Sequence, residues 1–569
     1  MKNKKIIIIS SIILIIVLVI LYSLVFKEKE MGSVSTTNNI DSNINTDDGD
    51  EDIVWSDYEN REIELTKSIT INEEGIYNLT GTISNGLITV NTEGNIKLNL
   101  NNVSITNSNG PAIYIEQASD VVINISGDNY LEDSSTYTNH TDVDGVLFSH
   151  DDLTIEGEGT LTIKANYQDG IVSKDDLKIV SGTYKINSID DGIRGKDSVY
   201  ILDGNFEINS EGDGIKSTND TDSEKGFIKI ENGKFKINSS LDGIQSENKL
   251  VIDNGEFDIT TGGGSSNESS TNDDWGYWGR GSTLSNTDSA KGLKAVDNIV
   301  INSGTFTFDT SDDSIHSNNS VGISDGTITI NSGDDGIHAD YELIIDNGNI
   351  DINKSYEGLE SAKITINGGN INLTSTDDGI NVAGGNDGSA TGRPGENNYS
   401  NSNNILTINN GIIYVNAKGD GIDVNGSAYI NNGNIRVDGP TDSGNGSLDY
   451  DRTFAINGGT FIATGSSGMA QSATNDSEQN NIMIYFKSTY SSDDTIKILD
   501  NNNNEIMSYK SEKSYSSLLF SSSLLQSNQT YTIMINESTY DTFEVTTTCN
   551  TIGNSMGNMH GPGGNMGRR

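Results

Sequence analysis

A short phrase, Asp-Gly-Ile or a close variant, recurs along the chain at a fixed interval. Its glycine stands at positions 170, 192, 214, 292, 336, 358 and 379, and the spacing from 170 to 192, from 192 to 214 and from 336 to 358 is 22 residues. Longer intervals contain polar Gly/Ser/Asn insertions at about 262–285 and 384–403. A strict period interrupted by insertions is typical of a solenoid, in which each repeat forms one coil.

Within each repeat, apolar and polar residues alternate in short runs, which is the periodicity of β-strands. One repeat reads Leu177-Lys-Ile179, then Tyr184-Lys-Ile186, then Gly192-Ile193. Asn-Gly pairs such as Asn232-Gly233 and Asn347-Gly348 supply the positive φ that a sharp corner needs. All repeats keep the same phase, whereas a hairpin stack or propeller would alternate it and need about 40–45 residues per unit.

The repeat therefore predicts an all-β fold, a right-handed parallel β-helix of about 22 residues per coil with coils about 4.8 Å apart. A small β-sandwich-like cap is expected because the last coil would otherwise leave an open strand edge. The predicted divisions are a membrane anchor at 1–30, a disordered linker at 31–52, the β-helix at 53–480, the cap at 481–548 and a disordered Gly/Met-rich tail at 549–569.

The first 26 residues have the pattern of a membrane anchor. Lys2, Lys4 and Lys5 precede an apolar run at 6–26, which as a helix would be about 31 Å long and match a hydrocarbon core of ~30 Å. The lysines favour a cytoplasmic N-terminus, so we expect one transmembrane helix and an extracellular C-terminal domain at the cell membrane. A cleaved signal peptide, which would make the protein secreted, stays open, although the run ends at Val25-Phe26-Lys27 without a small-residue cleavage site.

The net charge of the chain is −47, and the chain contains one cysteine. A phosphate backbone needs a basic face, so nucleic acid is excluded as a partner. One cysteine cannot form a disulfide framework or a Cys-based zinc site within one chain. The charge favours either a self-repelling surface, consistent with a monomer, or a surface that collects metal cations.

Stacked coils convert the repeat into rows, and the residue before the corner glycine is acidic in nearly every coil. Several coils add a second acidic residue just before it, and alternation from the inward-pointing Ile places these side chains on the outside. Carboxylates about 4.8 Å apart repel, so the row needs cations or shared protons. Oxygen ligands suit Ca²⁺, the predicted cofactor, although aspartate as a turn former explains the same positions. The predicted metal ligands are Asp190, Asp191, Asp213, Asp312, Asp313, Asp334, Asp335, Asp377 and Asp378.

The row that follows the inward Ile is mixed in charge. Its cations lie beside the acidic row and suit a linear anion such as an acidic polysaccharide, or they are ordinary exposed side chains. Two of the three tryptophans lie in one Gly-rich insertion, where exposed aromatic faces suit sugar rings or fold back to cover the solenoid. His316 and His338 are one period apart, which also permits metal ligation. The predicted carbohydrate-binding residues are Arg194, Lys216, Lys291, Lys294, His316, His338, Trp275, Tyr277 and Trp278.

Several features together resemble one family. The features are Gly75-Ile76-Tyr77, Ala112-Ile113, Ser289-Ala-Lys-Gly-Leu-Lys-Ala295, Ser516-Ser-Leu-Leu-Phe520 and Tyr531-Thr-Ile533. They are similar to bacterial cell-surface carbohydrate-binding proteins with a polysaccharide-lyase-like right-handed β-helix, over about 60–548. The resemblance implies calcium in the solenoid and binding of plant cell-wall polysaccharide, either cellulose or acidic pectin-type chains, without established catalysis.

Three functions therefore stay open. The primary prediction is non-catalytic, calcium-stabilised binding of plant cell-wall polysaccharide, with no catalytic residue assigned. A polysaccharide lyase would remove a proton beside a uronate carboxylate, with Ca²⁺ neutralising the acid and Lys or Arg as the base. Arg194, Lys216 and Lys294 lie beside carboxylates, but the cations are scattered along the helix and do not converge. A structural surface adhesin is the third possibility.

Overall fold

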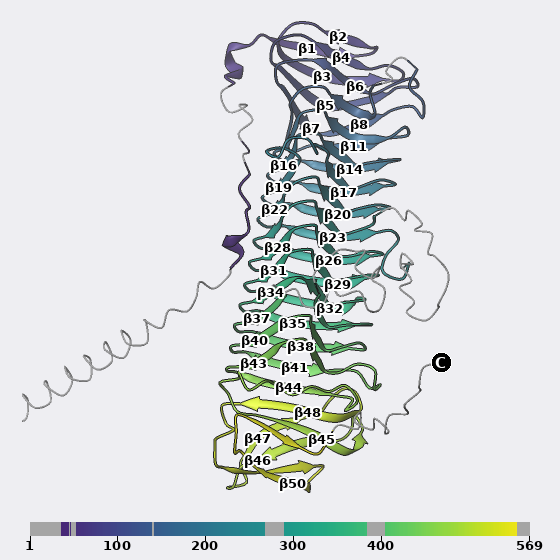
Figure 1. Cartoon of the computed structure of the whole chain (residues 1–569). Helices are drawn as coiled ribbons and strands as arrows, with labels where there is room; N and C mark the ends of the chain where they lie inside the picture. The colour runs from purple at the N-terminus through teal and green to yellow at the C-terminus, as the bar shows by residue number, and fades with distance from the viewer. Residues whose placement is uncertain are drawn as a thin grey trace, which may run out of the picture. The chain divides into compact units, whose positions relative to one another are not determined.

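The computed structural model describes residues 36–44, 46, 53–138, 142–267, 289–383 and 404–554. From Thr37 onward the chain forms one compact unit. Its described residues are almost entirely β-structure, with two short 3-10 turns at Thr37–Asn39 and Trp55–Asp57. The coils of this unit stack in one column, from β1 at one end to the cap at the other (Figure 1).

Each coil contributes three strands, so the column has three walls. The first wall contains β7 (Val121–Ser126), β10 (Leu153–Gly157), β13 (Asp176–Ile179), β16 (Ser198–Ile201), β19 (Phe227–Ile230), β22 (Leu250–Ile252), β25 (Ile299–Ile301), β28 (Ser320–Ile323), β31 (Glu342–Ile345), β34 (Lys363–Ile366), β37 (Ile405–Ile408), β40 (Ser427–Ile430) and β43 (Thr453–Ile456). The second wall contains β8 (Asp128–Glu132), β11 (Thr160–Lys164), β14 (Thr183–Ser188), β17 (Asn205–Ser210), β20 (Lys234–Ser239), β23 (Glu256–Thr261), β26 (Thr305–Thr310), β29 (Thr327–Ser332), β32 (Asn349–Lys354), β35 (Asn370–Ser375), β38 (Ile412–Ala417), β41 (Asn434–Asp438) and β44 (Thr460–Gly465).

The third wall, here called the short-strand wall, is a separate 15-stranded parallel sheet. Its strands are β2 (Ile69–Ile71), β4 (Ile88–Asn91), β6 (Ile113–Gln117), β9 (Gly145–Ser149), β12 (Asp169–Ser173), β15 (Ile193–Gly195), β18 (Ile215–Ser217), β21 (Ile244–Ser246), β24 (Leu293–Ala295), β27 (Ile315–Ser317), β30 (Ile337–Ala339), β33 (Leu359–Ser361), β36 (Ile380–Val382), β39 (Ile422–Val424) and β42 (Leu448–Tyr450). At the N-terminal end, β1 (Asn60–Leu65), β3 (Gly75–Ile83) and β5 (Ile96–Thr106) form the first coils of the other two walls.

Successive coils pair in parallel, in the register that the 22-residue period predicts. Leu177 lies opposite Val199, Tyr184 opposite Phe206, and Ile193 opposite Ile215. The inward residues of all three walls form one continuous apolar core. Part of that core is a column of stacked aromatic rings, with centroids of neighbouring rings 4.6–4.9 Å apart. The rings belong to Tyr184, Phe206, Phe235, Phe257 and Phe306.

The corner between the first and second walls is uniform. From β13 to β44 each connection is three residues long, as at 202–204 and 231–233, and its third residue is a glycine with positive φ. A Cβ on Gly233 would lie 3.1 Å from the carbonyl oxygen of Gly204 in the preceding coil. Glycine is therefore required both for the turn and for the close stacking of coils.

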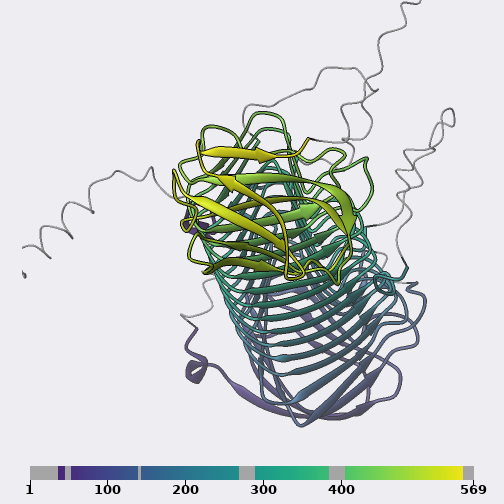
Figure 2. The same ribbon diagram turned by 90° about the horizontal axis from the view of Figure 1, so that it is seen from below.

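The cap closes the C-terminal end of the column (Figures 1 and 2). Its strands are β45 (Asn481–Tyr490), β46 (Ile496–Leu499), β47 (Glu505–Tyr509), β48 (Tyr515–Ser522), β49 (Thr530–Ile535), β50 (Ser538–Glu544) and β51 (Cys549–Ile552). Strand β48 pairs antiparallel with β44, which covers the open edge of the last coil. Four strands form a second, antiparallel sheet over a separate apolar core. Strand β51 extends beyond the predicted cap boundary at 548.

Part of the predicted linker packs against the solenoid instead of remaining separate. Thr37 donates through Oγ1 to Asp346 Oδ2 at 2.8 Å, and Ile40 is buried against a small apolar cluster on the outside of the first wall. The cluster contains Val251, Val300 and Ile344. The prediction was based on the polar average of the segment, which conceals two apolar residues, Ile40 and Ile44, that pack on this cluster.

The predicted membrane anchor requires a correction to the fold class. Residues 6–26 lie outside the described residues, and in the described part of the chain no helix is long and apolar enough to cross a bilayer. In the part of the chain that the structure describes, the fold class is all-β, and neither the predicted transmembrane helix nor the predicted single-pass location at the cell membrane is supported there. The prediction depended on the hydropathy and length of the run at 6–26.

Candidate functional site

Within the coils from β7 to β44, the long connections lie beside the short-strand wall. Between β13 and β44 the corner joining the first and second walls never exceeds three residues. The long connections join the short-strand wall to its neighbours, and they span 133–144, 218–226, 262–292, 383–404 and 439–447. In a solenoid, insertions that gather along one face mark the face that interacts with a partner. The outer side of the short-strand wall is therefore the candidate functional face.

The acidic positions before the corner glycines form one row, the aspartate row, along the edge of this wall. In several coils the carboxylate accepts a hydrogen bond from the backbone N–H of its counterpart in the next coil: Asp191 N donates to Asp169 Oδ1 at 3.0 Å, and Asp213 N to Asp191 Oδ1 at 2.9 Å. Asp313 and Asp335 repeat the contact at 2.9 Å. These aspartates are nearly inaccessible, with 1–6% of their surface exposed. The prediction that they project outward is wrong, because the backbone donors of the neighbouring coil hold them in the corner.

The adjoining row, the mixed row, is also aligned by the strand register. It contains Arg194, Lys216, Gln245, Lys294, His316, His338, Glu360, Asn381 and Asp423. Its character changes along the column from basic, through histidine, to acidic. We name the three parts the paired segment (Arg194 to Lys294), the histidine segment (His316 and His338) and the acidic segment (Glu360 to Asp423).

In the paired segment the cations neutralise the aspartate row. Arg194 lies 2.8 Å from Asp169 Oδ2, and Lys216 Nζ lies 2.6 Å from Asp213 Oδ2. Lys294 Nζ lies 3.1 Å from Asp242 Oδ2. Burial alone would lower the pKa of Lys216, but Asp213 and Asp191 outweigh it and the pKa is raised. These predicted sugar-binding cations are thus counter-ions within the chain.

In the histidine segment the neighbouring lysine, Lys291, is also paired with carboxylates of the same chain. Lys291 Nζ lies 2.8 Å from Asp312 Oδ1 and 2.7 Å from Asp313 Oδ2. The rings of His316 and His338 stack with centroids 4.7 Å apart, and the two residues are 4% and 1% exposed. Neither imidazole lies on an accessible surface, so the structure does not place them as contacts for a polysaccharide.

The acidic segment and the aspartates beside it, Asp378 and Asp420, have no comparable cations within the described ranges. Among the described residues, Asp378, Asp420 and Asp423 form no ion pair with Lys or Arg. Burial, followed by the neighbouring carboxylates, raises the pKa of Asp378 to about 8, of Asp423 to about 7 and of Asp420 to about 6. Asn381 Nδ2 donates to Glu357 Oε2 at 2.7 Å, while no described residue donates to its buried Oδ1.

The oxygen ligands of Asp378, Asp420, Asp423 and Asn381 suit a Ca²⁺ ion better than the acidic residues elsewhere in the two rows do. Calcium prefers carboxylate and amide oxygens, and Asn381 Oδ1 is such an oxygen without a donor. Two other sets, most of whose members are predicted ligands, also bring carboxylate oxygens within 4.8 Å of one another, but Arg194, Lys216 and Lys291 already neutralise their neighbourhood. Those sets are Asp169 with Asp190 and Asp191, and Asp312 with Asp313 and Asp334. The residues that sequence reasoning did not select are Asn381, Asp420 and Asp423, although the repeat places them in the same rows.

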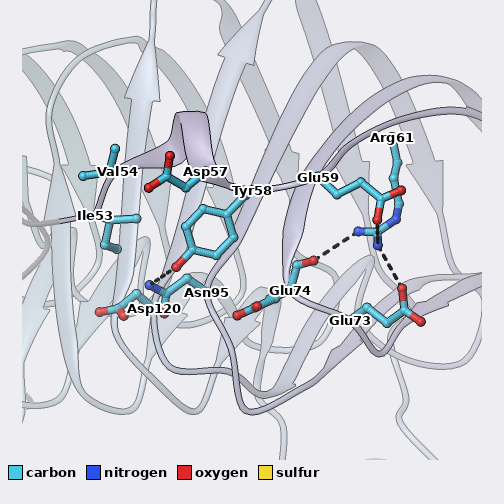
Figure 3. Close-up of a pocket in the computed structure, with 10 residues that line it drawn as sticks. All are labelled: Ile53, Val54, Asp57, Tyr58, Glu59, Arg61, Glu73, Glu74, Asn95 and Asp120. Carbon is cyan, nitrogen blue, oxygen red and sulfur yellow. Dashed lines mark hydrogen bonds and ion pairs between the residues drawn. The ribbon is translucent and has the colours of Figure 1, made fainter.

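The predicted aromatic patch cannot be assessed, because Trp275, Tyr277 and Trp278 lie outside the described residues. A different aromatic pair occurs at the first coil, where Trp55 and Tyr58 have ring centroids 5.2 Å apart. Tyr58 lines an open pocket of about 800 Å³ that is rich in carboxylates (Figure 3).

Arg61, the basic residue of this pocket, is hydrogen-bonded to other residues of the same chain. Arg61 donates to Glu73 Oε2 at 2.9 Å and to the Glu74 carbonyl at 3.1 Å. Asn95 Nδ2 donates to the Tyr58 hydroxyl at 3.2 Å. The pocket therefore offers carboxylates and one aromatic face to a ligand. The 22-residue repeat did not predict this pocket, because the pocket lies outside the regular coils.

A family model described as carbohydrate-binding domain-containing protein matches residues 66–336 and 335–379. A relative from Acetivibrio thermocellus (strain ATCC 27405) has the same description and is 35% identical over 136 residues, 22% of this chain and 46% of the relative. The match thus spans about half of that relative's length. A solved structure described as the polysaccharide lyase-like protein from C. thermocellum, a gadolinium derivative, is 32% identical and covers 36% of this chain and 92% of that one, with a TM-score of 0.35.

Proposed function

The chain belongs to the family of carbohydrate-binding domain-containing proteins, whose model covers more than half of it, and on this premise we propose that it binds plant cell-wall polysaccharide without cleaving it. The binding face is the outer side of the short-strand wall. The observation that carries this assignment is that the long connections between β7 and β44 all lie at the edges of that wall. The uniform three-residue corner between the other two walls leaves no comparable loops there.

Calcium has a defined place in this proposal. Asp378, Asp420, Asp423 and the Asn381 side-chain carbonyl would hold it in the acidic segment, with Asp377 beside them. When bound, Ca²⁺ neutralises these carboxylates and can accept a further carboxylate from a ligand. The buried, cation-poor character of the segment supports this placement over the paired segment, where lysine and arginine already supply positive charge.

The charge of the chain separates the two polysaccharide classes. With a net charge of −47, the chain repels an acidic pectin-type polysaccharide unless divalent cations bridge the two. Cellulose carries no charge and is not subject to this repulsion. Binding of an acidic chain should therefore require Ca²⁺, whereas binding of cellulose should depend on Ca²⁺ only through the stability of the fold.

A polysaccharide lyase is the second candidate, and the paired segment argues against it. A catalytic base must lose its proton near neutral pH, but the carboxylates around Arg194 and Lys216 raise the pKa of both despite their burial. Lys513 in the cap is the residue that favours a lyase. Burial lowers its pKa to about 8, and its Nζ donates to the carbonyl of Ala417.

The test is a binding assay on insoluble cellulose and on immobilised polygalacturonate, each with Ca²⁺ and with chelator. We expect retention on polygalacturonate in Ca²⁺ only, and its loss in the Asp378→Asn/Asp423→Asn variant. The matched control is Lys234→Gln/Glu256→Gln, which removes an exposed ion pair from the second wall and should bind as the wild type. Retention on neither polysaccharide in Ca²⁺ contradicts the proposal. Release of unsaturated product, followed by absorbance and abolished by Lys513→Met, would establish the lyase instead.

A further inference from the structure

A second pocket lies on the outer side of the second wall, where this wall meets the cap beside β38 and β41 (Figure 1). Its volume is about 420 Å³, within the ~300–1,000 Å³ that is usual for small-molecule sites. Strands β38 and β41 form its floor, and β47 with the connection that follows it forms one side. Its lining includes Ile412, Tyr414, Arg436, Asp438, Tyr509 and Glu512.

The outer surface of the second wall changes character at this pocket. Strand register aligns Ile412 with Asn370 and Tyr414 with Asn372 of the preceding coil. From β14 to β35 both positions hold only polar or charged residues. At β38 they become an isoleucine that is 57% exposed and a partly exposed tyrosine. The core does not require these two side chains, because the inward residues of the same strand are already buried, so both can contact a ligand.

Asp438 holds the two tyrosines of the pocket in place. It is 1% exposed, and it accepts hydrogen bonds from the hydroxyls of Tyr414 at 2.9 Å and of Tyr509 at 2.7 Å. It also accepts from Ser511 Oγ at 2.7 Å and from the Glu512 backbone N–H at 2.9 Å. These donors come from both the solenoid and the cap, so Asp438 joins the floor of the pocket to its side. A pocket that is already rigid loses little conformational entropy when a ligand binds.

The accessible charges of the pocket balance one another. Lys510 Nζ lies 3.6 Å from Asp493 Oδ1, whereas Arg436 forms no ion pair within the ranges that the structure describes. Of the two carboxylates in the lining, Asp438 is buried and Glu512 is exposed. A ligand therefore meets one guanidinium that donates and one carboxylate that accepts. Hydroxyl groups both donate and accept, so this pair suits an uncharged ligand rich in hydroxyls better than an acidic one.

We propose that this pocket binds a neutral polysaccharide without calcium, at a place separate from the short-strand wall. Ile412 and the ring of Tyr414 contact the apolar C–H face of a sugar ring, as aromatic and aliphatic side chains do in most ligand sites. Arg436 donates to the sugar hydroxyls, and Glu512 accepts from them. The choice of a sugar as ligand rests on the proposed function, whereas its position and its lack of charge rest on the pocket. The chain would thus hold an acidic polysaccharide and a neutral one at different places.

The experiment is calorimetric titration of cellohexaose into the full-length chain in the presence of chelator. The wild type should bind it saturably, and Ile412→Asn/Arg436→Gln should bind it about tenfold more weakly or not at all, because it loses the apolar contact and a charged hydrogen bond. Both positions are exposed, and asparagine already occupies the position of Ile412 in the preceding coil as Asn370, so this variant should fold. The matched control, Thr305→Asn/Lys236→Gln, changes exposed residues of the same two rows elsewhere on the wall and should bind as the wild type.

Further readouts separate this site from the calcium-dependent face. Asp378→Asn/Asp423→Asn should bind cellohexaose normally, and Ile412→Asn/Arg436→Gln should keep its Ca²⁺-dependent retention on polygalacturonate. Hexagalacturonate should not bind in chelator, and tighter binding than that of cellohexaose would overturn the assignment of a neutral ligand.

Three results overturn the site itself. They are no saturable binding of cellohexaose by the wild type, equal binding by wild type and Ile412→Asn/Arg436→Gln, and loss of binding in Asp378→Asn/Asp423→Asn alone. The last result would place the neutral chain on the short-strand wall and leave the proposed function intact. Loss of Ca²⁺-dependent retention on polygalacturonate in the wild type, with cellohexaose binding unchanged, would instead contradict the calcium-dependent face and leave this pocket standing.

Discussion

Replacing Arg194 is the most informative test of how the two charged rows stabilise the fold. Its guanidinium lies 2.8 Å from Asp169 Oδ2 and 2.5 Å from Asp144 Oδ2, and the three side chains are 18%, 1% and 23% exposed. Arg194→Met would keep much of the packing and leave both carboxylates without their cation. Removing one partner of a buried ion pair costs about 3–5 kcal/mol. Because Arg194 and Asp144 retain some solvent contact, we expect the lower end, about 3 kcal/mol.

The pH dependence of this loss follows from Asp169. Burial raises its pKa to about 8 even though Arg194 opposes the shift. A carboxyl group with a raised pKa binds more protons in the folded than in the unfolded state between about pH 4 and pH 8. Stability therefore falls as the pH rises through this window, and without Arg194, which opposes the rise in the pKa of Asp169, the fall should continue to a higher pH. The loss caused by Arg194→Met should therefore be smaller at pH 5 than at pH 8.

The assay is urea unfolding of wild type, Arg194→Met and Arg194→Met/Asp169→Asn at both pH values. The double variant should recover most of the loss at pH 8, because no uncompensated charge remains at position 169. The control, Lys234→Met, removes an exposed pair with Glu256 and should have no measurable effect. Equal stability of Arg194→Met and wild type at pH 8 would refute the counter-ion role and return Arg194 to the set of possible ligand contacts.

Three further predictions follow from the same structure. Chelator should lower the melting temperature of the wild type, and the shift should be smaller in Asp378→Asn/Asp423→Asn; the same melting curve with and without chelator would exclude structural calcium. Phe235→Ala should cost about 3–5 kcal/mol in urea unfolding by opening the aromatic column, whereas Lys236→Ala on the outer face of the same strand should not. Burial raises the pKa of Asp133 to about 6, so stability should fall between about pH 4 and pH 6, and Asp133→Asn should flatten this slope.

The repeat was sufficient to predict the coils and their rows. Residues 22 apart, such as Ile193 and Ile215, lie opposite each other, because a constant period in a solenoid becomes a constant register. The corner glycines and the inward Ile could be assigned for the same reason. The row membership of Asp191, Asp213 and His338 was also predictable.

The function of each row position was not predictable from the period. Whether Lys216 faces solvent or Asp213 depends on side-chain direction, which the spacing of one residue type does not fix. Whether the buried side-chain carbonyl of Asn381 has a hydrogen-bond donor depends on residues of neighbouring coils. The contact of Ile40 with Ile344 joins segments about 300 residues apart. Such contacts require coordinates because nothing local in the sequence encodes them.

The central claim is that polysaccharide binds along the short-strand wall. Hydrogen–deuterium exchange of the Ca²⁺-loaded chain, with and without polygalacturonate, tests it directly. We predict slower exchange in β30, β33, β36 and β39 and in the connections beside them, with no change in β14, β17, β20 and β23 of the second wall. Protection confined to the second wall would contradict the assignment of the binding face.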